Sequence, residues 1–269
     1  MTMGAKPLEL AAIRRGARGR TTVILHGFTG TGQAMHALAD SLPGRVVAPD
    51  LLGHGASPAP GAVDAYRAEA QVGQVLGLVS VDGTDAEPMD VVGYSMGARL
   101  ALCLAIAHPT RIRRLALIGA TAGLASVSER ASRVAADEAL ADQIEREGID
   151  WFVRHWEAMP LFSSQQDLPA SVRDEVRAGR LAQRSLGLAN SLRGFGTGVM
   201  PSLWHRLADL ELPTLLVAGA RDPKYVALAG QMAALLPDAS MEVVAGVGHA
   251  CHLEAPETVA ALVVAHFSA

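Results

Sequence analysis

The hydrophobic positions of this chain follow two periods that alternate along most of its length. Short runs of continuous apolar residues, typical of buried strands, alternate with stretches whose apolar residues recur every three or four positions, as on one face of a helix. The runs predict strands over residues 21–25, 45–48, 89–92, 114–118, 214–218 and 241–244. The periodic stretches predict helices over residues 33–42, 64–80, 96–107, 226–236 and 256–267. Continuous apolar strands separated by helices predict an α/β fold with a mostly parallel sheet and helices on both faces.

This alternation stops between residues 124 and 205, where only helical patterns occur. Two helix starts fall in the stretch, at Ser126-Val127-Ser128-Glu129 and at Leu168-Pro169-Ala170-Ser171. Strand and helix alternate again after Leu212-Pro213. We therefore expect one α/β core made of residues 1–123 and 206–269, with residues 124–205 inserted as a helical cap.

Composition and charge exclude several classes of protein. The chain has 269 residues, of which 50% are hydrophobic and 19% charged, which excludes a disordered chain. The net charge of −4 argues against a nucleic-acid partner. The apolar run over residues 100–107 is too short to span a bilayer, and residues 1–10 lack the apolar core of a signal peptide. Because Cys103 and Cys251 lie far apart in apolar surroundings, we expect buried thiols in a cytoplasmic protein without membrane insertion, with a disulfide as the weaker alternative.

The sharpest local motif is Gly93-Tyr94-Ser95-Met96-Gly97, between a predicted strand and a predicted helix. This is the G-x-S-x-G pattern of a nucleophile elbow in the structural context that it requires. The tight turn strains the serine backbone, and a glycine on either side keeps the turn clear of neighbouring backbone. We therefore expect Ser95 to present its hydroxyl over the sheet at a helix N-terminus, where developing anions are stabilised.

A serine nucleophile needs a base, and the base needs a carboxylate to orient it. His249 follows the last predicted strand and Gly248, which favours it over His252, a residue that begins to look helical. Asp222 follows the strand over residues 214–218 and gives the chain order Ser, Asp, His. Asp50 is the rival carboxylate, but it lies upstream in a Pro–Asp turn and would break that order.

An oxyanion hole requires two convergent backbone N–H groups. We expect the N–H of Met96, next after the nucleophile, to be one, and the N–H of Phe28, on the loop after the first predicted strand, to be the other. The histidines show no H-E-x-x-H spacing, and Lys6 and Lys224 lack the glycines of a phosphate-binding loop. The sequence therefore predicts neither a metal site nor a cofactor.

These residues resemble the α/β-hydrolase superfamily over essentially the whole chain. The matching segments are His-Gly-Phe at 26–28, Pro-Asp-Leu-Leu-Gly-His-Gly at 49–55, the elbow at 93–97, the Asp222 loop, and the stretch that begins at Gly248. One branch resembles the chain further: the pyruvate-eliminating 2-succinyl-6-hydroxy-2,4-cyclohexadiene-1-carboxylate synthases of menaquinone biosynthesis. That resemblance extends from the elbow through Arg99 and Leu102, and it covers segments of the cap at 128–137, 160–162, 187–193 and 196–204.

The resemblance implies a small-molecule substrate with several carboxylates, bound by arginines and a cap tryptophan. The positions that match are Tyr94, Arg99, Arg133, Trp156 and Arg180, with Arg184 as the alternative to Arg180. The chain departs from the family pattern at Ala98, Val199 and Ala220-Arg221, and none of these departures removes a catalytic group.

Two reactions are open to such a triad. The resemblance implies that Ser95, deprotonated by His249, removes a ring proton so that pyruvate is eliminated, with Phe28 and Met96 stabilising the negative charge that develops. The triad by itself favours acyl transfer, as in a carboxylesterase, a thioesterase or a carbon–carbon bond hydrolase. A binding module with a vestigial site is a third reading, and the intact order of Ser, Asp and His argues against it.

Overall fold

A seven-stranded sheet forms the centre of the computed structural model, which describes residues 8–79 and 87–269. Ser80, at the end of a predicted helix, and residues 1–7, part of the segment without an apolar signal core, lie outside the described residues. The sheet order is β1-β3-β2-β4-β5-β6-β7, and only β1 runs antiparallel to its neighbour. The strands are β1 (Ala12–Arg15), β2 (Thr21–Leu25), β3 (Arg45–Pro49), β4 (Met89–Tyr94), β5 (Ile112–Ile118), β6 (Thr214–Gly219) and β7 (Ala239–Val244). The predicted parallel strands are confirmed, and β1 is an addition that the sequence did not indicate.

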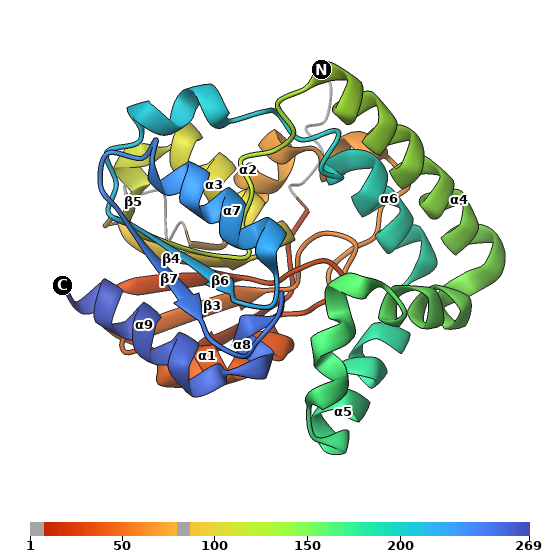
Figure 1. Cartoon of the computed structure of the whole chain (residues 1–269), viewed down its shortest axis with the longest axis horizontal. Helices are drawn as coiled ribbons and strands as arrows, with labels where there is room; N and C mark the ends of the chain where they lie inside the picture. Colours follow the sequence, from red (N-terminus) through yellow and green to blue (C-terminus); the bar gives the residue numbers. More distant parts are fainter. Residues whose placement is uncertain (1–7, 80–86) are drawn as a thin grey trace, which may run out of the picture.

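Helices cover both faces of this sheet, as the continuous apolar strands predicted. The core helices are α1 (His36–Ser41), α2 (Ala68–Val79), α3 (Met96–Ala107), α7 (Pro223–Ala233), α8 (Cys251–Glu254) and α9 (Pro256–Ser268), with the 3-10 turns η1 (Gln33–Met35), η2 (Val63–Tyr66) and η3 (Pro109–Arg111). Figure 1 shows α2, α3 and α7 on one side of the sheet and α1 and α9 on the other. Two apolar clusters fill these layers, one that includes Val75, Leu100 and Met232 and one that includes Leu38 and Val263.

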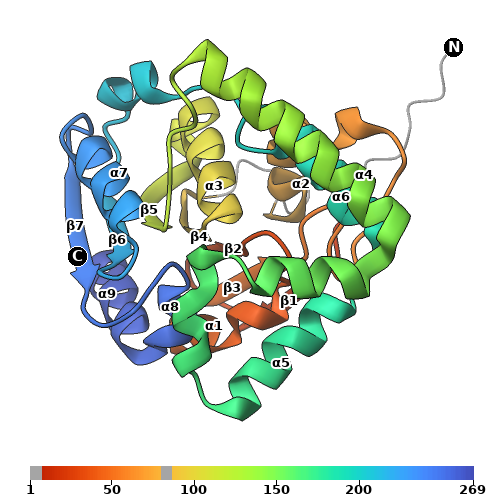
Figure 2. The ribbon, with the colours of Figure 1, turned by 45° about the vertical axis from the view of Figure 1, so that its right-hand side comes forward.

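The chain between β5 and β6, all of it described, contains helices and no strand. Its elements are α4 (Val127–Glu157), η4 (Pro160–Asp167), α5 (Ala170–Leu181), α6 (Ser185–Phe195) and η5 (Trp204–Asp209). Both predicted helix starts are present: the Ser126 side chain accepts a hydrogen bond from the N–H of Glu129, and α5 begins at Ala170. α4 is interrupted at Gly148, whose φ of 81° is not helical. Figure 2 shows α4, α5 and the green segment η4 in front of the core, with η4 next to α8.

Candidate active site

Ser95 occupies the turn between β4 and α3 and has a φ of 51° and a ψ of −106°, a strained conformation for a residue with a side chain. Both flanking glycines are sterically required. A Cβ on Gly93 would overlap the carbonyl oxygen of Gly97, and a Cβ on Gly97 would overlap that of Leu25. The turn is held from below by a 2.8 Å hydrogen bond from the Ser95 N–H to the carbonyl of Ile118. The local geometry is therefore that of the predicted nucleophile elbow.

Ser95, His249 and Asp222 form one hydrogen-bonded chain. Nε2 of His249 lies 3.0 Å from Oγ of Ser95, and Nδ1 of His249 lies 2.8 Å from Oδ2 of Asp222. His249 and Asp222 are buried, at 3% and 7% exposure. Because the Nδ1–H of His249 donates a hydrogen bond to Asp222, Nε2 is left free to accept a hydrogen bond from the Ser95 hydroxyl. The structure thus brings together the three residues that the motifs selected from β4, β6 and β7.

The two rival residues serve other contacts. The ring of His252 packs against Tyr94 at 4.1 Å between centroids, and burial followed by the nearby His249 lowers the pKa of His252 to about 3. Asp50 accepts hydrogen bonds from the backbone N–H groups of Gly32 and Ala56, at 2.7 and 2.8 Å. These contacts assign Asp50 to the folding of its own loop rather than to the triad.

The loop that carries Phe28 lies directly against the nucleophile. A Cβ on Gly27 would come within 2.6 Å of the Tyr94 ring and 3.5 Å of the Ser95 Cβ. His26 anchors this loop: Nδ1 lies 2.7 Å from the carbonyl of Gly27, and Nε2 accepts the N–H of Leu51 at 2.9 Å. Burial lowers the pKa of His26 to about 4, so the ring stays neutral and keeps one donor and one acceptor. Sequence reasoning missed this anchor, although a His-Gly pair directly after a strand could have indicated it.

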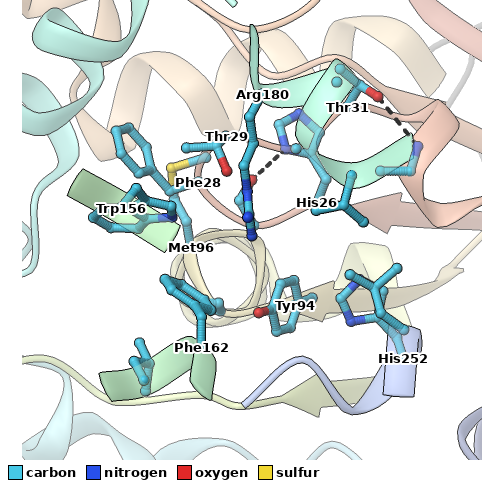
Figure 3. Close-up of a pocket in the computed structure, with 18 of the residues that line it drawn as sticks. His26, Phe28, Thr29, Thr31, Tyr94, Met96, Trp156, Phe162, Arg180 and His252 are labelled. Atoms are coloured by element: carbon cyan, nitrogen blue, oxygen red, sulfur yellow. Dashed lines mark hydrogen bonds between the residues drawn. The ribbon is translucent and has the colours of Figure 1, made fainter. Parts of the chain in front are cut away.

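A cavity of about 870 Å³ lies between the core and the helices that follow β5. It is lined on the core side by Ser95, Met96 and Phe28 and on the other side by residues of α4, η4, α5 and α6. Aromatic rings form part of its wall, with Trp156 at 5.2 Å from Phe28 and 5.4 Å from Phe162 between centroids. Figure 3 shows Arg180 and Tyr94 extending toward each other inside this cavity.

Arg99 is the most unusual charge in the cavity. Its guanidinium is buried, at 9% exposure, and donates to the carbonyl of Phe195 at 2.7 Å and to the sulfur of Met200 at 3.6 Å. It also lies 4.8 Å from the centre of the Phe195 ring. It forms no ion pair with any carboxylate in the described part of the chain. Burial lowers the pKa of Arg99 to about 10, which leaves it protonated at neutral pH.

Two further predicted arginines line the same cavity. Arg180, 7% exposed, donates to Gln165 at 3.0 Å and to Glu157 at 3.3 Å, and burial lowers its pKa. Arg133 is half-exposed and pairs with Asp137 at 2.8 Å.

Arg184 does not line the cavity and donates instead to the carbonyls of Gly55 and Ser57. The alternative that placed Arg184 in the site instead of Arg180 is therefore wrong. The two remaining predicted ligands, Tyr94 and Trp156, do line the cavity. The Nε1 atom of Trp156 is buried without a hydrogen-bond partner in the described structure. Burial raises the pKa of Tyr94 well above its ordinary value, which keeps its hydroxyl protonated.

The structure describes residues 8–79 and 87–269. Within these ranges no group of three or more His, Cys, Asp or Glu side chains is placed to hold a metal ion. No described helix combines the length and apolar character needed to cross a membrane. Cys103 and Cys251 are both buried and unpaired. The chemical groups that the cavity offers are thus the Ser95 hydroxyl, hydrogen-bonded to His249, and the buried guanidinium groups of Arg99 and Arg180.

Comparison with known proteins places the chain among similar sequences and structures. Residues 22–256 match the alpha/beta hydrolase fold family. A Bacillus subtilis protein named putative 2-succinyl-6-hydroxy-2,4-cyclohexadiene-1-carboxylate synthase is 41% identical over 87% of this chain and 85% of its own. The synthase of the same name from Serratia proteamaculans is 29% identical over 94% of this chain and 96% of its own. The structure of MenH from S. aureus superimposes with a TM-score of 0.90 at 30% identity, covering 96% of this chain and 97% of that one.

Proposed function

As this chain belongs to the alpha/beta hydrolase fold family, and within it to the 2-succinyl-6-hydroxy-2,4-cyclohexadiene-1-carboxylate synthases, we propose that it is a lyase of menaquinone biosynthesis that eliminates pyruvate from a succinylated cyclohexene carboxylate. The observation that carries the proposal is the buried Arg99, a cation in the cavity beside the Ser95 helix with no carboxylate of its own. A buried cation without an ionic partner is costly unless a ligand supplies the opposite charge. A substrate with several carboxylates does so.

The proposed proton transfer begins at the triad. His249, held by Asp222, takes the hydroxyl proton of Ser95, and the Ser95 oxygen removes the ring proton on the carbon that carries the succinyl ketone. That proton is acidic because the electron pair left behind delocalises onto the ketone oxygen. We assign the N–H groups of Phe28 and Met96, two residues that line the cavity beside Ser95, to stabilise this enolate.

The enolate then collapses and expels pyruvate. Its electron pair forms the second ring double bond, the carbon–oxygen bond to the pyruvate portion breaks, and pyruvate leaves as its enol. The proton taken from the ring returns through Ser95 and His249 to the leaving group, which tautomerises to pyruvate. No water is consumed, so the reaction differs from hydrolysis while it uses the same three side chains.

The substrate carboxylates have three cations available in the cavity. Arg99 and Arg180 are buried and Arg133 is half-exposed. The planar guanidinium matches a carboxylate in a way that lysine does not reproduce. We assign Trp156 and Tyr94 as neutral hydrogen-bond donors to the same ligand, since both line the cavity.

The test is a coupled assay for pyruvate release from freshly made precursor. We expect Ser95→Ala to lower the rate by about a hundredfold to ten-thousandfold, since it removes the proposed base. Ser268→Ala, an exposed serine at the end of α9, is the matched control and should keep the wild-type rate. A wild-type rate of pyruvate release in Ser95→Ala would contradict the proposal and would favour a binding function without catalysis.

The second candidate is a serine hydrolase, because the Ser95–His249–Asp222 hydrogen bonds are also those that an acyl-enzyme needs. Incubation with p-nitrophenyl acetate followed by intact-mass measurement separates the two. Fast turnover through an acylated Ser95, with no pyruvate formed from the precursor, would favour the hydrolase. Slow turnover on the ester together with pyruvate release would favour the lyase.

We also propose a cytoplasmic location and a small-molecule partner only, with no nucleic acid. The unpaired, buried state of Cys103 and Cys251 supports a reducing compartment, and the net charge of −4 gives no electrostatic attraction to nucleic acid. Fractionation of cells that express the native chain tests the location. Recovery of the protein with membranes at high salt would contradict it.

A further inference from the structure

The short helix η4 makes a direct contact with the loop that carries His249. The hydroxyl of Ser164, 4% exposed, donates to Oε1 of Glu254 at 2.9 Å. The other oxygen of Glu254 accepts the backbone N–H of Gly248 at 2.7 Å. Gly248 is the residue before His249, so the carboxylate of Glu254 joins η4 to the backbone beside the base. Figure 2 shows η4 lying next to α8, the helix that ends at Glu254.

The fit at this contact leaves no room for adjustment. A Cβ on Gly248 would overlap the Ser164 hydroxyl and lie 2.9 Å from the Ser164 Cβ. The Ser164 side chain therefore approaches the backbone of Gly248 as closely as a glycine permits. A displacement of η4 would consequently displace the backbone of Gly248 and, with it, the ring of His249.

A second link connects η4 to the loop of the triad carboxylate. Arg221, the residue before Asp222, pairs with Asp167 at the end of η4 at 2.6 Å. The N–H of Arg221 also donates to the carbonyl of Val247 at 2.9 Å, which ties the two triad loops to each other. This ion pair is exposed, so it contributes less than the buried Ser164–Glu254 contact.

The same helix supports the cavity arginine of α5. Gln165 accepts a hydrogen bond from Arg180 at 3.0 Å, and the Arg180 guanidinium lies 5.5 Å from the centre of the Phe162 ring. The Phe162 ring in turn lies 6.3 Å from that of His249, edge to face. η4 therefore contacts both Arg180, which we assign to bind the substrate, and His249, the proposed base.

We propose that η4 positions His249 through the relay Ser164–Glu254–Gly248, so that the segment which holds Arg180 also sets the alignment of the triad. Glu254 and Ser164 are positioning residues: neither reaches Ser95, and both act through the backbone next to His249. The proposal rests on the role of His249 in the proposed function and does not depend on which substrate is bound.

The test uses two reactions of the full chain. The first is pyruvate release, from which kcat and KM are measured separately. The second is labelling of Ser95 by a fluorophosphonate: the serine oxygen displaces fluoride from phosphorus while His249 takes the proton. Labelling needs His249 but no carboxylate ligand. If wild type is labelled but releases no pyruvate, the proposed function fails while the labelling rates still decide the present proposal.

We expect Glu254→Ala to lower both kcat and the labelling rate by about tenfold to a hundredfold, because small displacements of a catalytic group cost factors of this size. KM should change by less than about threefold. Ser164→Ala removes the hydrogen bond between Ser164 and Glu254 but leaves the bond from the Gly248 N–H to Glu254 in place. It should therefore lower both rates by about threefold to tenfold.

Rescue and control variants separate positioning from folding. Glu254→Gln can accept the Gly248 N–H with its oxygen and donate to the Ser164 hydroxyl with its nitrogen, so both rates should return to within about threefold of wild type. Glu257→Ala, an exposed glutamate in the first turn of α9, should match wild type. The proposal is overturned if Ser164→Ala keeps both wild-type rates, or if Glu254→Gln has rates no higher than those of Glu254→Ala. It is also overturned if the variants at Glu254 and Ser164 change KM but neither kcat nor the labelling rate.

Discussion

Replacement of Arg99 by methionine should separate stability from substrate binding. The guanidinium is 9% exposed and has only the Phe195 carbonyl and the Met200 sulfur as hydrogen-bond partners. Methionine keeps much of the apolar volume of the side chain and removes the charge. Because the free protein holds this cation without an ionic partner, we expect Arg99→Met to be tolerated by the fold and harmful to the reaction.

The magnitudes follow from burial and from the lost ligand contact. Lowering the pKa of Arg99 from 12.5 to about 10 corresponds to about 3 kcal/mol against the charged form in the folded protein. Loss of the hydrogen bond to Phe195 offsets about 1 kcal/mol of this. We therefore expect the free energy of unfolding to stay unchanged or to rise by up to about 2 kcal/mol. Loss of a charge-assisted bond to a substrate carboxylate, about 1.5–3 kcal/mol, lowers kcat/KM by about tenfold to a hundredfold.

The assay combines urea unfolding with pyruvate release at several substrate concentrations. Arg146→Met, an exposed arginine with a surface partner in Glu147, is the control and should change neither quantity measurably. A wild-type kcat/KM in Arg99→Met would refute the carboxylate contact. A loss of several kcal/mol in unfolding free energy would refute the reading of Arg99 as an uncompensated charge.

Three further perturbations test other parts of the molecule. Burial lowers the pKa of His54 from 6.5 to about 3, so below pH 6.5 the unfolded chain binds a proton that the folded chain does not. The free energy of unfolding should therefore fall below pH 6.5 by about 1.4 kcal/mol per pH unit for this group. His54→Leu should show a shallower fall in urea midpoints between pH 7 and 5 than the wild type. Arg180→Met should lower kcat/KM for the polycarboxylate by about tenfold or more, whereas Arg184→Met, which loses bonds to loop carbonyls, should mainly lower Tm; equal effects on kcat/KM would contradict this assignment. Gly97→Ala should prevent folding because its Cβ overlaps the Leu25 carbonyl, and Gly77→Ala, in open space on α2, should raise the free energy of unfolding by about 0.5–1 kcal/mol in a urea titration.

The sequence was sufficient for elements whose surroundings are uniform. The strands of the sheet centre are buried along their whole length, so their apolar runs match their burial, as in β4 and β6. β1 escaped prediction because it is four residues long, carries Arg14 and Arg15, and is only half-buried. Its formation depends on the free edge of β3, with which it pairs, and not on a pattern of its own.

The triad was predictable because each member lies directly or shortly after the end of a strand. Ser95 follows β4, Asp222 lies shortly after β6, and His249 lies shortly after β7. In a parallel sheet the carboxyl ends of the strands lie at one edge, so residues far apart in the chain meet there. Chain order and glycine spacing, both local properties, therefore carried three-dimensional information.

The contacts of the helices between β5 and β6 follow no such rule. Arg180 and Arg184 are four residues apart and would share one face of a continuous helix, yet α5 ends at Leu181 and directs Arg184 to the carbonyls of Gly55 and Ser57. Helix ends are the least certain part of any sequence pattern. The contact between Ser164 and Glu254 joins residues 90 positions apart and depends on how η4 packs against α8, which no local pattern encodes.

Burial distinguishes the arginines more sharply than residue type does. In the described part of the chain only Arg99 and Arg180 are buried among the arginines, and both line the cavity beside Ser95. A structural arginine would be expected to bury its charge against a dedicated carboxylate, whereas Arg99 has none and Arg180 shares Glu157 with Arg177. The buried carboxylate of Asp137 also lines the cavity and favours the charged form of Arg99 through space, but it pairs directly with Arg133 and not with Arg99. A ligand carboxylate would give Arg99 the direct ionic partner that no described side chain provides, which is an argument for the substrate class that is independent of sequence similarity.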